Sequence, residues 1–135
     1  MPHCVILYTP NLEAKSDVGV LCRKLADTML TIRDEAGKQV FPTGGTRVLA
    51  YPAAHYAVAD GKGDYGFMYL NVRMGLGRSD AVKKHAGDSL LAVVKEHFAP
   101  IFDQVPVGLT LQIDESPGQV YDGKHSSLHP LFNKG

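Results

Sequence analysis

The stretch DYGFMYLNVRMGLGRSD, residues 64–80, carries the clearest structural signal in this chain of 135 residues. Its first eleven residues are rich in aromatic and apolar side chains, which predicts a strand over residues 64–74. A glycine-rich turn follows, and Ser79 or Asp80 is a suitable cap for a helix that runs to about Phe102. A strand over residues 109–113 comes after Pro106. The sequence of the second half of the chain therefore predicts a strand, a helix and a strand, in that order.

The first half of the chain repeats this order. CVILY, residues 4–8, lacks polar alternation and is typical of a strand that is covered on both faces. Ser16 and Asp17 open a stripe of apolar residues at helical spacing, which we expect to end at Gly37. RVLAY, residues 47–51, predicts a strand that is interrupted at Pro52. Aligning residues 16–17 with residues 79–80 superposes the two strand-to-helix loops, which indicates a duplicated βαβ unit.

These elements predict one α+β domain over residues 1–135, with a core at 1–115 and an irregular C-terminal tail at 116–135. We expect a four-stranded mixed sheet with both helices on one face. The first and third strands are apolar on both faces, and two helices can cover only one of these faces. The other face is therefore expected to be covered by another subunit.

Composition limits the partners that this chain can bind. The formal net charge is zero, which argues against nucleic acid and against an anionic membrane held by bulk charge. The amino-terminal segment lacks a basic region and its apolar run is short, so it predicts neither a signal peptide nor a membrane span, and we expect a cytoplasmic protein. Cys4 and Cys22 are far apart and no CxxC is present, which predicts neither a disulfide framework nor a zinc site. Both are expected to be small buried residues, and no metal is expected.

Pro2 directly follows Met1, so removal of that methionine would leave proline as the amino terminus. A free terminal proline is a secondary amine, and a terminal amine titrates at about 8. Such an amine could take a proton from an enol oxygen and deliver one to a distant carbon, so that it serves both steps of a ketonisation. If Met1 remains attached, the Pro2 nitrogen is an amide and cannot act as a base.

Five short motifs occur in a common order along nearly the whole chain. They are Met1-Pro2-His3, Phe41-Pro42-x-x-Gly45-x-Arg47, Ala59-Asp60-Gly61 with Asp64-Tyr65-x-Phe67, Gly75-x-Gly77-Arg78-Ser79, and His129-x-Leu131-Phe132. In order and spacing these motifs resemble the 5-carboxymethyl-2-hydroxymuconate isomerase family, part of the tautomerase superfamily and related in fold to 4-oxalocrotonate tautomerase and macrophage migration inhibitory factor.

The resemblance implies a homotrimer of β-α-β-β-α-β subunits in which Pro2 is the catalytic base and acid. It implies that Arg47 and Arg78 bind the carboxylates of a small polycarboxylate enol. The implied reaction ketonises 5-carboxymethyl-2-hydroxymuconate to 5-carboxymethyl-2-oxo-hex-3-ene-dioate in the degradation of homoprotocatechuate, which derives from 4-hydroxyphenylacetate. The implied enzyme needs no cofactor and no metal.

The residues also leave other interpretations open. Another proline-based tautomerase would act on a smaller enol such as phenylpyruvate, and a non-catalytic trimeric binding module would keep the fold alone. Arg47 could be a solvated charge at a strand start. Arg78 follows a glycine turn at a helix amino terminus, which favours an anion site, although the turn contains no GxGxxG nucleotide motif. His129 could approach the site through the tail.

Overall fold

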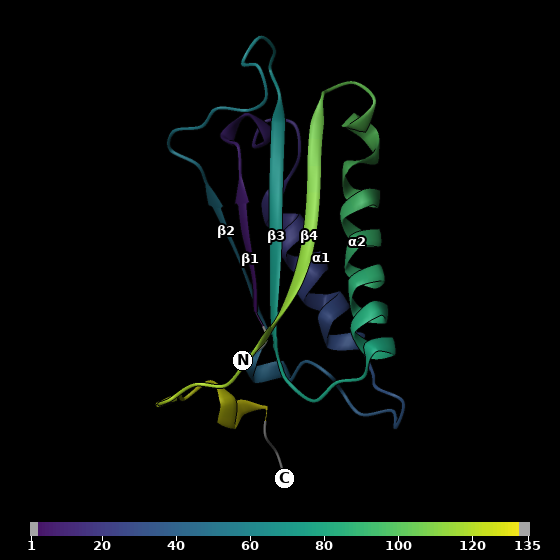
Figure 1. Ribbon diagram of the computed structural model, residues 1–135, viewed down its shortest axis with the longest axis vertical. Helices are drawn as coiled ribbons and strands as arrows, with labels where there is room; N and C mark the ends of the chain where they lie inside the picture. Colours follow the sequence, from purple (N-terminus) through teal and green to yellow (C-terminus); the bar gives the residue numbers. More distant parts are fainter. Residues whose placement is uncertain (1–2, 133–135) are drawn as a thin grey trace.

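The computed structural model describes residues 3–132. Its strands and helices follow the order β-α-β-β-α-β, as the sequence predicted (Figure 1). Short 3-10 turns lie at Pro10–Leu12 (η1), Thr43–Gly45 (η2) and His129–Leu131 (η3). The main elements are β1 (His3–Tyr8), α1 (Val18–Thr31), β2 (Arg47–Pro52), β3 (Gly66–Gly75), α2 (Asp80–Phe102) and β4 (Val107–Ser116).

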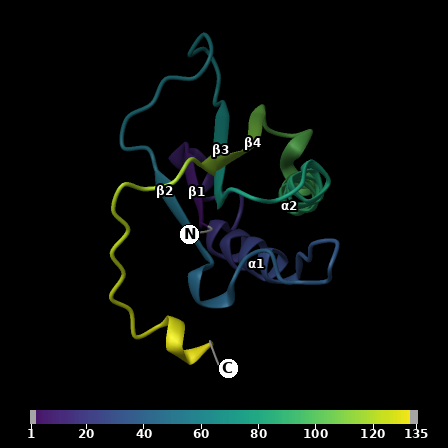
Figure 2. The same ribbon diagram turned by 60° about the horizontal axis from the view of Figure 1, so that its bottom comes forward.

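The four strands form one mixed sheet in the order β2-β1-β3-β4. β1 runs parallel to β2, β3 runs parallel to β4, and the central pair β1 and β3 is antiparallel. Each half of the chain is therefore a βαβ unit with parallel strands. Both helices lie on one face of the sheet (Figure 2). This arrangement confirms the predicted α+β class, the mixed sheet and the one-sided helical layer.

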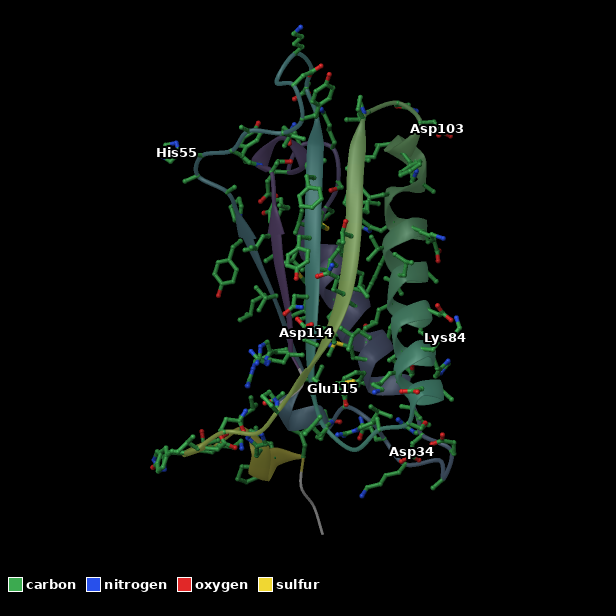
Figure 3. The ribbon with its side chains drawn as sticks, in the orientation of Figure 1. Asp34, His55, Lys84, Asp103, Asp114 and Glu115 are labelled. Atoms are coloured by element: carbon green, nitrogen blue, oxygen red, sulfur yellow. The ribbon has the colours of Figure 1, made fainter. Side chains whose placement is uncertain are left out.

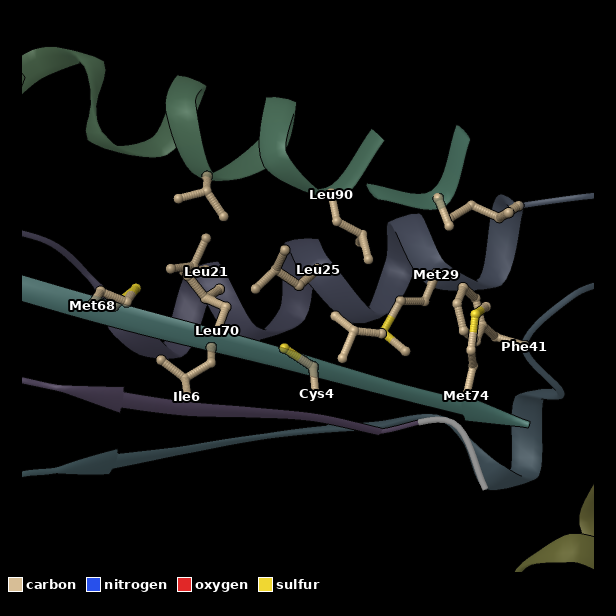
Figure 4. Packing of buried hydrophobic residues seen from close by; sticks show 14 of the residues in the cluster. Cys4, Ile6, Leu21, Leu25, Met29, Phe41, Met68, Leu70, Met74 and Leu90 are labelled. Atoms are coloured by element: carbon tan, nitrogen blue, oxygen red, sulfur yellow. The ribbon is translucent and has the colours of Figure 1, made fainter. Parts of the chain in front are cut away.

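The core lies between the sheet and the two helices. Alternate residues of β1, namely Cys4, Ile6 and Tyr8, point into it and are at most 4% exposed. The apolar stripes of α1 and α2 pack against them, as the helical spacing predicted (Figure 4). Buried members of these stripes are Val18, Leu21, Leu25 and Met29 of α1, and Val82, Ala86, Leu90, Val94 and Phe98 of α2.

The expected end of α1 at Gly37 is wrong, because the helix ends at Thr31. Ile32 is buried in an extended conformation, which takes the chain out of the helix. The Asp34 carboxylate then accepts hydrogen bonds from the backbone N–H groups of Ala36 and Lys38. Such a local turn competes with the helical hydrogen bonds and ends their repeat. Gly37 serves this turn with a φ of 78°, a region that favours glycine.

The helix-free face of the sheet is uncovered in the single chain. Leu7, Leu49, Tyr51 and Phe67 on this face are each at least 38% exposed. The prediction that the CVILY strand is covered on both faces therefore holds for only one face within this chain. We use the name open face for the helix-free surface formed by the alternate residues His3, Val5 and Leu7 of β1 and the side chains that align with them on β2, β3 and β4.

The start of β1, the η2 turn and the C-terminal tail lie at one end of the molecule (Figure 1). Residues 117–132 leave the sheet and run along this end as a largely exposed segment. The η3 turn packs beside η2, where the site of an added Gly44 Cβ lies 3.1 Å from the His129 Cα atom. The start of β1, the start of β2 and the C-terminal tail therefore lie at the same end of the molecule.

Candidate functional site

The predicted base, Pro2, lies outside the described residues, and its neighbour His3 is the first residue of β1. His3 pairs with Arg47, the first residue of β2, in the parallel register. The structure therefore places Arg47 beside the residue that is bonded to Pro2. Of the two predicted arginines, Arg47 is the one that strand pairing places directly beside the start of β1.

Arg47 is exposed and lines two cavities at this end of the molecule. One, of about 650 Å³, lies against α1 and includes Cys22 and Leu30 in its lining. The other, of about 320 Å³, lies between the start of β2 and the tail. Within residues 3–132 no hydrogen bond or ion pair holds the Arg47 side chain. A guanidinium that is not held by such contacts can bind a carboxylate with both of its outer nitrogens.

The tail forms the opposite wall of the smaller cavity and brings basic residues toward Arg47. Lys124, His125 and His129 line it together with Arg47. Lys124 forms an ion pair of 2.6 Å with Asp122, and it holds the pKa of that carboxyl below its usual range. The sequence anticipated only His129 here. Lys124 and His125 were missed because a tail without regular structure gives no spacing from which their position could be inferred.

Arg78 lies immediately before the Ser79 cap of α2. Its Nη2 donates to the Val40 carbonyl at 2.9 Å, and its Nη1 lies 3.5 Å from the Gly75 carbonyl. Gly77 precedes it with a φ of 109°, which a side chain would strain, so the glycine turn serves to reverse the chain toward α2. The guanidinium is thus partly engaged by backbone carbonyls of its own chain.

The cavity beside Arg78 has a volume of about 210 Å³ and contains carboxylates as well as cations. Glu35 accepts a hydrogen bond of 2.5 Å from the Ser79 hydroxyl, which lowers the pKa of the Glu35 carboxyl. Asp34 lines the same cavity and lies beyond the start of α2 (Figure 3). Arg47 and Arg78 line different cavities among the described residues. The Arg78 guanidinium nevertheless approaches Gly75, which lies two residues beyond the Arg73–His3 pair on β3.

A third arginine, Arg73 of β3, also lies beside the start of β1, although no sequence motif pointed to it. It pairs with His3 in the antiparallel register and is exposed. The alternation of residues 64–74 places Arg73 on one face of its strand, but only strand pairing reveals that this face is shared with His3 and Arg47. This is why the sequence pattern did not identify it.

The cysteines and the acidic residues show no sign of a reactive or metal site. Burial raises the pKa of the Cys4 thiol to about 12, and it also raises the pKa of Cys22. Cys4 is buried as predicted, whereas Cys22 is half-buried. In the described part of the chain no group of three or more His, Cys, Asp or Glu side chains could hold a metal ion. No helix there combines the length and the apolar character needed to cross a membrane.

Comparison with known proteins gives consistent matches over the whole chain. A model of the 5-carboxymethyl-2-hydroxymuconate isomerase family matches residues 2–132. A solved structure described as a 5-carboxymethyl-2-hydroxymuconate delta-isomerase is 56% identical, with a TM-score of 0.94, and the match covers 100% of this chain and 95% of that one. A second solved structure, of a 5-carboxymethyl-2-hydroxymuconate isomerase from Deinococcus radiodurans R1, is 35% identical, with a TM-score of 0.84, over 98% of this chain and 95% of the other.

An Escherichia coli protein described as 5-carboxymethyl-2-hydroxymuconate Delta-isomerase is 27% identical over 132 residues, which are 98% of this chain and 99% of that protein. A macrophage migration inhibitory factor-like protein from Entamoeba histolytica, at 11% identity and a TM-score of 0.55, shares the fold alone. These matches confirm the resemblance that the five motifs suggested. The chain therefore belongs to the 5-carboxymethyl-2-hydroxymuconate isomerase family, and the isomerase class predicted from its sequence is confirmed.

Proposed function

We propose that this chain ketonises 5-carboxymethyl-2-hydroxymuconate to 5-carboxymethyl-2-oxo-hex-3-ene-dioate. The observation that carries the proposal is the family match over residues 2–132, which extends from Pro2 to the end of the described tail. The 56% identity to a solved structure described as this isomerase, with matching backbone along the whole chain, supports the same substrate class.

In the proposed reaction one proton moves within the substrate. The Pro2 nitrogen, freed by removal of Met1, takes the proton from the 2-hydroxyl oxygen. The oxygen electron pair forms the C2=O bond, the C2=C3 bond becomes C3=C4, and the C4=C5 electrons form a new C5–H bond. Pro2 supplies the proton for that bond and returns to its neutral form. The substrate is neither oxidised nor reduced, and a single base near neutrality serves both transfers.

The arginines are proposed to bind the substrate carboxylates and to stabilise charge that develops on the enolate. Arg47 is suited to this role because it lies beside β1 and has no ion pair among the described residues. A guanidinium near the developing oxyanion lowers the barrier, since it is already oriented when the charge forms. Arg78 lines a separate cavity in the single chain. We propose that Arg78 joins Pro2 and Arg47 in a site formed between subunits.

The proposed assembly is a homotrimer that covers the open face. Exposed leucine and aromatic side chains on one continuous face of a sheet are typical of a subunit interface. The start of β1 lies at the border of this face, which is where a neighbouring subunit would approach Pro2. The cavity beside Arg47 would then be closed on one further side by that subunit.

The test is a comparison of the mature wild-type protein with Pro2→Ala, using 5-carboxymethyl-2-hydroxymuconate as substrate and the loss of dienol absorbance as the signal. We expect kcat/KM to fall by about 100-fold or more, because a positioned acid–base group contributes 10²–10⁴ in rate. Intact mass measured on each preparation verifies that Met1 has been removed. Pro106→Ala, at an exposed proline between α2 and β4, is the matched control and is expected to retain full activity.

Three outcomes would contradict the proposal. Full turnover by protein that retains Met1 would exclude the Pro2 amine as the base. Efficient turnover of phenylpyruvate with none of the tricarboxylate would assign a smaller enol as the substrate. A protein that turns over neither substrate while remaining trimeric would correspond to a binding module.

A further inference from the structure

Three strands bring two arginines to the start of β1 in one row across the sheet. His3 pairs with Arg47 of β2 on one side and with Arg73 of β3 on the other. The neighbours of this row along β1 and β3, Cys4 and Val72, are at most 1% exposed and point to the helices. Because side chains alternate along a strand, His3, Arg47 and Arg73 belong to the open face.

Arg73 forms no ion pair with any carboxylate of the described residues, although Asp114 lies opposite it on β4. No ion pair or hydrogen bond of its guanidinium is found within residues 3–132. The carboxylate nearest in register is Asp114, its Cα partner on β4. Asp114 Oδ2 instead accepts a hydrogen bond of 2.7 Å from the Asn71 side chain. By contrast Arg23, on the outer surface of α1, is paired with Asp27 at 2.8 Å.

The surroundings of this row make an unpaired cation costly. Further along the open face, the side chains of Val5, Leu7 and Leu49 are apolar, whereas beside Arg73 the side chain of Asn71 donates a hydrogen bond to Asp114. When a second subunit covers such a face, a cation at its border loses water, and this is unfavourable unless an anion binds it. Two unpaired guanidiniums on this border therefore favour a ligand that carries more than one negative charge.

The spacing of the two arginines suits a small polycarboxylate. They lie on strands that flank β1 on either side, and neighbouring strands are about 4.8 Å apart, so their Cα atoms are separated by roughly 10 Å. Long arginine side chains can close this distance onto two carboxylates of one small substrate, one of them on its carboxymethyl branch. Arg47 and Arg78 account for two carboxylates of the proposed substrate, and its third carboxylate needs a third cation.

We propose that Arg73 binds the carboxymethyl carboxylate of the substrate and so determines the preference for tricarboxylate over dicarboxylate enols. This inference rests on the proposed function, which supplies the substrate class. Arg73 takes no part in the proton transfer. Its removal therefore weakens binding of the third carboxylate and leaves the chemistry at the enol in place.

The test compares Arg73→Gln with the wild-type protein on two enols, 5-carboxymethyl-2-hydroxymuconate and 2-hydroxymuconate, which lacks the carboxymethyl group. For the tricarboxylate we expect KM to rise roughly tenfold or more with a smaller change in kcat, because the variant loses a charge-assisted hydrogen bond. For the dicarboxylate we expect KM and kcat within about twofold of wild type, since no bond to this substrate is lost. Arg73→Lys, which keeps the charge, should recover part of the lost tricarboxylate affinity.

Arg33→Gln is the matched control, because Arg33 is exposed at the end of α1 and its side chain donates only to backbone carbonyls of residues 30 and 32. It should leave the kinetics of both enols unchanged. Sedimentation of each variant checks that the assembly is intact. Should Arg73→Gln alter neither substrate, or weaken both by the same factor in an intact assembly, the assignment of Arg73 is wrong while the proposed function stands. Wild-type protein that turns over neither enol would overturn the proposed function and this inference together.

Discussion

At the scale of single residues, strand pairing decides which charges meet. Arg47 was identified by a motif, and its position beside His3 follows from the register of β1 and β2. Arg73 has no motif of its own, yet the antiparallel register of β3 places it on the other side of the same residue. The Arg78 guanidinium contacts the carbonyls of Val40 and Gly75, and Gly75 lies two residues after Arg73 on β3.

His97 provides a residue-scale prediction for the pH dependence of stability. Its imidazole is half-buried on α2, and Lys24 Nζ of α1 lies 3.4 Å from its Nδ1. Burial, and then the Lys24 charge, lower the pKa of His97, while Asp17 acts weakly in the opposite direction. The folded state therefore binds fewer protons at His97 than the unfolded chain does between its lowered folded pKa and about 6.5. We therefore expect the free energy of unfolding to decrease as pH falls through this window. Above the window, titration of His97 should not change the free energy of unfolding.

Urea unfolding of the wild-type protein, His97→Gln and His55→Gln at pH 7.5 and 5.5 measures this effect. His55 is exposed in the loop between β2 and β3 and serves as the control (Figure 3). The urea midpoint should fall less between the two pH values in His97→Gln than in the other two proteins. Identical decreases in all three would show that His97 does not contribute.

At the scale of the elements, the sequence located the strands and helices better than their ends. A cap for α2 was predicted at Ser79 or Asp80, and Ser79 is the cap of a helix that starts at Asp80; Asp17 caps α1 in the same way. The end of α1 was placed six residues too late. The end of α1 depends on the burial of Ile32 and on the local turn around Asp34. The spacing of apolar residues predicts neither of these features.

The Ser79 cap can be tested by Ser79→Ala. The Ser79 hydroxyl accepts a hydrogen bond of 3.2 Å from the Val82 N–H and donates one of 2.5 Å to Glu35. Loss of an N-cap costs about 1 kcal/mol, so the free energy of unfolding should fall by about that amount. Ser89→Ala, on the same helix and away from its ends, is the control and should be close to neutral. An equal effect of both substitutions would contradict a capping role for Ser79.

At the scale of the whole molecule, the open face is the feature that a single chain leaves incomplete. The sequence anticipated this from strands that are apolar on both faces, and the structure locates the exposed side chains on β1, β2 and β3. The two predicted arginines also line separate cavities within one chain. Both observations favour an active site that is completed by assembly.

We expect Leu7→Lys to disrupt this assembly. Leu7 is 49% exposed near the middle of the open face, and a charge there would be buried without a partner in a trimer. Sedimentation equilibrium should give three chain masses for the wild-type protein and a shift toward the monomer for Leu7→Lys. Activity should fall in parallel. Val20→Lys, at an exposed position on α1, is the control and should remain trimeric. A wild-type protein that sediments as a monomer would contradict the trimer.

The sequence by itself determined the order of the elements, the two helical stripes, the buried strands and the residues Pro2, Arg47 and Arg78 as candidates, because periodicity, caps and motifs are local properties of the chain. Only the tertiary structure decided that Arg73 joins Arg47 at the start of β1, that the tail lines the cavity beside Arg47, and that Arg78 lines a different cavity. These relations depend on strand register and on contacts between distant segments, such as Gly44 with His129. Register is set by the packing of a whole face, and no short stretch of sequence contains that information.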